Sequence, residues 1–148
     1  MTFSRPRADP RSPPSDFDEL VDWFERVSCQ LVLLEAVPLR DLEGAVRRFE
    51  REVRAHLRAF DPPLDRPSAP SPAHAEVRAI LRSDHAWFLT SLEQLDWFYR
   101  IVEGDDHGGH RQALGQYGRI FAEALQRHRR DERSYLAGPA ELSTGAPR

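Results

Sequence analysis

The sequence predicts an all-α protein folded as one antiparallel, up-down-up-down four-helix bundle. Three observations lead to this prediction. Apolar residues recur at steps of three and four along four segments, prolines fall between those segments, and no segment alternates apolar and polar residues as a strand would. Short connections join the first two and the last two segments, which favours antiparallel neighbours. A length of 148 residues, 40% of them hydrophobic, suits one domain with one sizeable core.

The first two predicted helices lie in the N-terminal half. The first runs from about Asp16 to Ala36, and Ser15 and Asp18 have the spacing of a capping box at its start. The second starts near Pro38, and Pro62 is expected to stop it. The two apolar stripes are Phe17, Leu20, Val21, Phe24, Val27, Leu31 and Leu34, then Leu42, Val46, Phe49, Val53, Leu57 and Phe60.

The third and fourth predicted helices lie in the C-terminal half. The third opens at Ser71-Pro72, a cap followed by a first-turn proline, and ends near Glu103. The fourth runs from about His110 to Leu136. Their stripes are Val77, Leu81, Phe88, Leu92, Leu95, Tyr99 and Val102, then Leu114, Tyr117, Phe121, Leu125, His128 and Tyr135.

Proline-rich stretches set the domain organisation. Residues 1–14 are predicted to be a disordered Pro/Arg-rich tail, and residues 138–148 a flexible C-terminal tail. Residues 61–72 are predicted to form a stiff, extended loop. Residues 15–137 then make up the bundle domain.

Composition excludes several functional classes. No apolar run approaches the roughly 18 residues that a membrane span needs, and the N-terminus lacks the apolar region of a secretory signal. The single cysteine, Cys29, excludes an internal disulfide framework. A net charge of -3 from 21 basic and 24 acidic residues argues against general nucleic-acid binding. We therefore expect a cytoplasmic protein, of a bacterial type, that binds neither membrane nor nucleic acid.

Three of the four stripes carry histidine or carboxylate at inward positions, where a bundle core prefers apolar residues. These are Glu52 and His56, Asp84 and His85, and His128 and Glu132, on the second, third and fourth helices. Their heights along the bundle place them in one region. Two interpretations stay open. Imidazole and carboxylate can hold iron, zinc or manganese, or the pairs Glu52–His128 and His56–Glu132 can satisfy each other without a metal.

Three segments resemble the hemerythrin-like, or HHE, cation-binding domains. EALQRHRRDERSYL (residues 123–136) is similar to the family's last helix, EREVRAHLRAF (50–60) to its second, and AILRSDHAWFLTSLEQL (79–95) to its third. The resemblance implies a four-helix bundle that binds iron or another divalent metal. By the family's motifs the ligands are His56, His85, His128 and Glu132, with Glu52 and Asp84 as additional candidates.

The chain departs from the family pattern at several ligand positions. Phe60 stands where the second helix normally has a bridging Glu, and Leu89 stands where the third often has a second His. The first helix carries no His. The resemblance therefore implies a reduced or vestigial site, for at most one metal, in a non-catalytic or weakly metal-binding protein. The alternative is a protein that holds no metal or other cofactor.

Two alternatives to the metal site remain. A non-enzymatic module could form a homodimer through Trp87, Trp97 and Tyr99 of the third helix, unless Gly115 and Gly118 bring the fourth helix close to those rings. An all-α, HEPN-like nuclease or toxin-system component is the third candidate, although its Arg–His spacing occurs here no more often than chance predicts. In the 104–110 loop, Asp105, Asp106, His107 and His110 could hold a metal or simply line a glycine turn.

Overall fold

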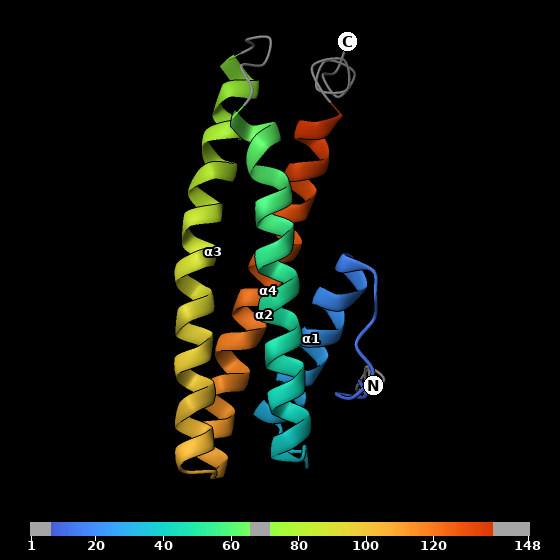
Figure 1. Cartoon of the computed structure of the whole chain (residues 1–148), viewed down its shortest axis with the longest axis vertical. Coiled ribbons are helices and arrows are strands. Elements are labelled where there is room, and N and C mark those ends of the chain that lie inside the picture. The colour runs from blue at the N-terminus through green and yellow to red at the C-terminus, as the bar shows by residue number, and fades with distance from the viewer. Residues whose placement is uncertain (1–6, 66–71, 138–148) are drawn as a thin grey trace, which may run out of the picture.

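The computed structural model describes residues 7–65 and 72–137, and over these residues it confirms the all-α prediction. The four helices are α1 (Phe17–Val32), α2 (Leu39–Asp65), α3 (Pro72–Gly104) and α4 (Gly108–Leu136). Figure 1 shows three long helices, α2, α3 and α4, with the shorter α1 alongside only part of their length. No strand occurs in the described residues.

The core divides into two clusters because α1 is short. The larger cluster draws apolar side chains from all four helices, and its fully buried members include Phe49, Phe88, Tyr99 and Phe121. The smaller cluster is Phe60, Leu81 and Tyr135, with Val77 packed against it. The smaller cluster lies at the end of the bundle that α1 does not reach (Figure 1). Three helices alone therefore enclose the core at this end.

α1 starts close to the predicted residue, but its cap differs from the predicted one and the helix ends earlier. Its N-cap is Asp16, whose side chain accepts a hydrogen bond from the Glu19 N–H at 3.0 Å, so the predicted box at Ser15 is wrong. The helix ends at Val32 rather than near Ala36, since Leu34 adopts a left-handed conformation (φ 56°). Leu34 reaches the start of α4, where a Cβ added at Gly108 would lie 3.1 Å from its Cδ2. The turn toward α2 therefore begins earlier than the apolar stripe suggests.

The boundaries of the other three helices match more closely. α2 continues past Pro62 to Asp65, so the predicted stop and the start of the predicted loop are wrong. Pro62 and Pro63 lie in the last turn and leave the carbonyls of Arg58 and Ala59 without helical N–H donors. Both of these residues are exposed, so solvent can supply the missing hydrogen bonds. α3 begins at Pro72 as predicted. Residues 66–71 of the predicted loop lie outside the described residues.

The segment before α1 packs on that helix. The Ala8 N–H donates to Gln30 Oε1 at 2.9 Å, and the Trp23 indole N–H donates to the Asp9 carbonyl at 2.8 Å. Ala8 is buried. The predicted disordered tail is therefore wrong from residue 7 onward, while residues 1–6 and the predicted tail 138–148 lie outside the described residues.

Gly115 and Gly118 of α4 face α1. A Cβ at Gly115 would lie 2.5 Å from the Ser28 carbonyl oxygen, and one at Gly118 would lie 2.4 Å from the Ser28 hydroxyl. The expectation that they approach the rings of α3 is wrong, because the helix that needs the space is α1. None of the described helices has the length and hydropathy needed to cross a membrane.

Candidate metal centre in the bundle core

Glu132 is the centre of a polar group inside the bundle. It follows His128 by one helical turn on α4, so both side chains point the same way, and both are buried. From α2, His56 Nε2–H donates to Glu132, with 2.9 Å to each carboxylate oxygen. The predicted pair His56–Glu132 is therefore present.

His128 is held from its other side by α3. Its Nδ1–H donates to Asp84 Oδ2 at 2.9 Å, which in a neutral ring leaves the lone pair on Nε2. Nε2 is fully buried and faces Glu132 Oε1 at 2.8 Å. The predicted pair Glu52–His128 is wrong, since Glu52 lies 3.3 Å from Arg48 on its own helix.

His85 lies beside these residues. Its side chain is buried, its ring centroid is 5.0 Å from that of His128, and its ring meets Phe60 at 6.2 Å. The structure thus gathers five of the six predicted residues, on three helices, and places Glu52 elsewhere.

The walls of the site include two residues that the sequence analysis did not assign to it. Phe17, at the start of α1, stacks on His56 with 4.1 Å between ring centroids. Arg129 lies over the Phe17 ring, donates to Asp18 at 2.8 Å, and reaches Glu132 Oε2 at 3.4 Å. Oppositely charged residues three positions apart on a helix often pair, so the contact between Arg129 and Glu132 could have been predicted from the sequence.

The charges of the two central residues are strongly coupled. Burial alone would raise the pKa of Glu132, but its close contacts with His128 and His56 outweigh burial and lower that pKa to about 2. Burial would likewise lower the pKa of His128, but its contacts with Glu132 and Asp84 prevail and raise it. Without a metal, the pair is therefore an imidazolium facing a carboxylate.

No family model, no curated protein and no solved structure matches this chain. The hemerythrin-like resemblance accordingly stays a prediction from the residues themselves.

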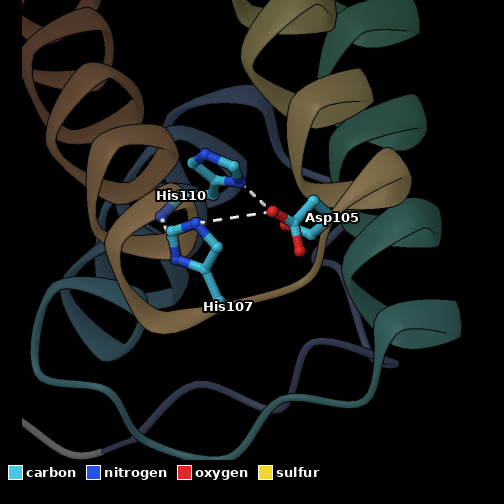
Figure 2. Close-up of side chains that lie close together, drawn as sticks. All are labelled: Asp105, His107 and His110. Carbon is cyan, nitrogen blue, oxygen red and sulfur yellow. Dashed lines mark hydrogen bonds and ion pairs between the residues drawn. The ribbon is translucent and has the colours of Figure 1, made fainter.

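A second group of possible ligands lies on the surface, at the turn between α3 and α4. Figure 2 shows Asp105, His107 and His110 side by side. Across the described residues they are the one set of three whose ligand atoms all lie within 4.8 Å of one another. The core residues do not reach this spacing because the Glu132 carboxylate stands between the two imidazoles, in contact with both.

The surface group already has a structural role. His107 is the N-cap of α4, and its Nδ1 accepts from the N–H groups of Gly109 at 3.1 Å and His110 at 3.4 Å. A neutral imidazole with Nδ1 as acceptor carries its proton on Nε2, which then cannot bind an ion. His110 Nδ1–H donates to the Asp105 carbonyl at 2.7 Å. Binding a metal through His107 would therefore cost α4 its cap.

Proposed function

We propose that this chain is a metal-binding helical bundle that holds one divalent transition-metal ion between His56, His128 and Glu132. Two imidazoles and one carboxylate form a donor set typical of non-haem iron(II), and also suited to zinc and manganese. The proposal makes the chain a reduced relative of the hemerythrin-like domains, without catalytic activity of its own. The observation that carries it is the convergence of two imidazole nitrogens on one buried carboxylate: His128 Nε2 lies 2.8 Å from Glu132 Oε1, and His56 Nε2 lies 2.9 Å from the same group.

The contact between Asp84 and His128 supports the same function. Metal-binding histidines commonly donate their other ring N–H to a carboxylate, which fixes the tautomer and makes the ligand nitrogen more basic. Asp84 accepts that bond at 2.9 Å and thereby directs the Nε2 lone pair of a neutral His128 toward Glu132. His85, beside His128, is the nearest candidate for a further ligand.

Binding requires a small rearrangement. His56 and Glu132 must turn so that one ion, rather than the carboxylate alone, joins the two imidazoles, and binding must release the protons that now occupy the pair. His56 can turn because it lies at the edge of the core with 14% of its side chain exposed. Arg129 opposes a cation here, but its bond to Asp18 gives it another partner.

Arg129 also marks the side from which an ion would enter. A surface pocket of about 180 Å³ between α1 and α4 is lined by Asp18, Val21, Asp22, Gln126, Arg129 and Arg133. Arg129 both lines this pocket and contacts Glu132, so its guanidinium separates the carboxylate from solvent.

Metal analysis of untagged protein tests the proposal. After growth with added iron, zinc and manganese, we expect elemental analysis to find close to one ion per chain, and much less in His128→Ala and Glu132→Gln. His110→Ala is the matched control, because it removes an imidazole from the surface group and should leave the metal content unchanged.

Two results would contradict the proposal. One is less than about a tenth of an equivalent of every metal in the wild-type protein, which would leave a buried His–carboxylate network without an ion. The other is loss of metal in His110→Ala with full retention in both core variants, which would place the ion at the α3–α4 turn.

A further inference from the structure

α3 carries a second stripe on its outer side, opposite the core. The stripe consists of Ile80, Ser83, Trp87, Thr90, Gln94 and Trp97, at alternating steps of three and four residues. This is the heptad spacing with which one helix packs along another. All six residues are exposed, and we refer to them as the outer stripe.

The outer stripe contains no charge although α3 is a charged helix. Between residues 80 and 97, the charged residues Arg82, Asp84, Glu93 and Asp96 all fall off the stripe. Asp96 lies on the flank toward α2, where it pairs with Arg47, whereas Trp87 leans toward α4 and meets the Phe121 ring at 6.0 Å. A helix face that served only solvation would have no reason to exclude charges over this length.

The stripe also exposes large apolar side chains. Ile80, Trp87 and Trp97 are 51%, 45% and 56% exposed. An aromatic side chain buries roughly 150–250 Å² when fully covered, so the two indoles alone offer on the order of 200 Å². The weakest specific interfaces need roughly 500 Å² from each partner. Ile80 and the uncharged side chains between the indoles bring the stripe toward that area.

The outer stripe is complementary to the outer stripe of a second copy of the chain when the two α3 helices run antiparallel. Heptad packing of antiparallel helices, with a two-fold axis between Phe88 and Leu89, sets Ile80 against Trp97 of the other copy. In the same register, Ser83 faces Gln94 and Trp87 faces Thr90, and the two-fold axis repeats each pair. Apolar thus meets apolar, polar meets polar, and each central indole meets a small side chain.

We propose that the outer stripe is a homodimer interface in which α3 of one copy packs antiparallel on α3 of another. The interface does not include Tyr99, expected from sequence to share it, because that side chain is 0% exposed. It is independent of the metal centre, whose residues lie on the inner side of the bundle. The small area predicts a reversible dimer that dissociates on dilution in the micromolar range.

Sedimentation across a range of protein concentrations tests the dimer. We expect Thr90→Glu to weaken dimerisation at least tenfold, because it sets a carboxylate against the negative face of each central indole while removing no apolar contact within the monomer. Trp97→Glu should act in the same direction. Leu89→Glu is the matched control. Leu89 is 44% exposed on the same helix but lies off the outer stripe, so the Leu89→Glu variant should dimerise like the wild-type protein.

Cysteine cross-linking tests whether the two α3 helices run antiparallel. The experiment uses a Cys29→Ser background, and thermal melts confirm that each variant folds. An antiparallel dimer should cross-link when the Ser83→Cys and Gln94→Cys chains are mixed, and neither variant should cross-link with itself. Self-linking of each variant would overturn the antiparallel arrangement. A wild-type monomer at every concentration, or an unchanged dimer in Thr90→Glu, would overturn the interface.

Discussion

At the scale of single residues, the two nitrogens of His128 decide how the core site works. Asp84 accepts from Nδ1, so Nε2 must either carry a second proton or offer its lone pair to a cation. The raised pKa of His128 describes the first state, in which Glu132 balances the charge. The proposed metal ion replaces that proton, so one geometry serves both states.

Asp84 should therefore control metal affinity without touching the ion. Asp84→Asn keeps the size and the acceptor oxygen but removes the negative charge, so the Nε2 of His128 becomes less basic. We expect a loss of about 10–100-fold in affinity, measured by competition with a chelator of known strength. Asp105→Asn, on the surface group, should change nothing. A change of less than about threefold in Asp84→Asn would deny Asp84 this orienting role.

Single residues also show how far sequence alone could locate this site. The inward positions of His56, His128 and Glu132 follow from helical periodicity, and the structure brings these three together. Glu52 fails because it lies on the flank of α2 next to Arg48, a small rotation that periodicity does not resolve. The bond between Asp84 and His128 was out of reach because it depends on how α3 and α4 are rotated against each other.

At the scale of elements, the contact between α1 and α4 depends on the absence of side chains. Ser28 of α1 packs directly against the backbone of α4 at Gly115 and Gly118. At Gly115 the nearest atom is a backbone carbonyl oxygen, which cannot rotate away, whereas at Gly118 it is a hydroxyl, which can. The two positions should therefore differ in how well they tolerate alanine.

Alanine substitutions at three helical glycines should separate packing from helix propensity. Gly115→Ala should lower the free energy of unfolding by about 1–2 kcal/mol. A Cβ 2.5 Å from a backbone oxygen puts the overpacking cost in the upper part of the usual range, at about 2–3 kcal/mol, against roughly 1 kcal/mol gained in helix propensity. Gly44→Ala on α2, where an added Cβ meets nothing within 4 Å, should raise the free energy of unfolding by about 0.5–1 kcal/mol. Gly118→Ala should fall between them. Equal effects in urea denaturation at Gly115 and Gly44 would contradict this account.

The elements themselves were largely predictable, because each apolar stripe spans several turns. The helix ends that were predicted wrongly are those where local sequence signals do not decide the boundary. Leu34 continues the apolar period of α1, yet it leaves the helix to pack on Gly108, a contact that no local pattern reveals. Pro62 resembles a stop signal, but in the last turn of α2 the carbonyl that loses its N–H donor belongs to an exposed residue, Arg58.

At the scale of the whole molecule, the polar site joins the two parts of the core. Phe88 of the larger cluster meets His128 at 5.0 Å, and Phe60 of the smaller cluster meets His85 at 6.2 Å. The site thus lies where α1 begins and the four-helix region gives way to three helices, with Phe17 of α1 stacked on His56. Charge at this junction should therefore affect the stability of the entire bundle.

The stability of the metal-free protein should peak in mildly acidic solution. The pKa of Glu132 falls from 4.5 to about 2 on folding, so its contribution is complete above pH 4.5 and is lost as the pH falls toward 2. The pKa of His128 is raised above 6.5, so its contribution is complete below pH 6.5 and is lost as the pH rises through the raised value. Both losses break one ion pair, on the order of 2–3 kcal/mol counted once. Urea denaturation in the presence of a chelator should therefore show the highest unfolding free energy between about pH 4.5 and 6.5.

Two substitutions test whether Glu132 causes this pH dependence. Glu132→Gln should flatten the decline of the unfolding free energy on both the acidic and the alkaline side. Glu93→Gln, at an exposed site off the core, should leave both declines unchanged. A Glu132→Gln protein with the wild-type pH profile would show that the pair does not govern stability.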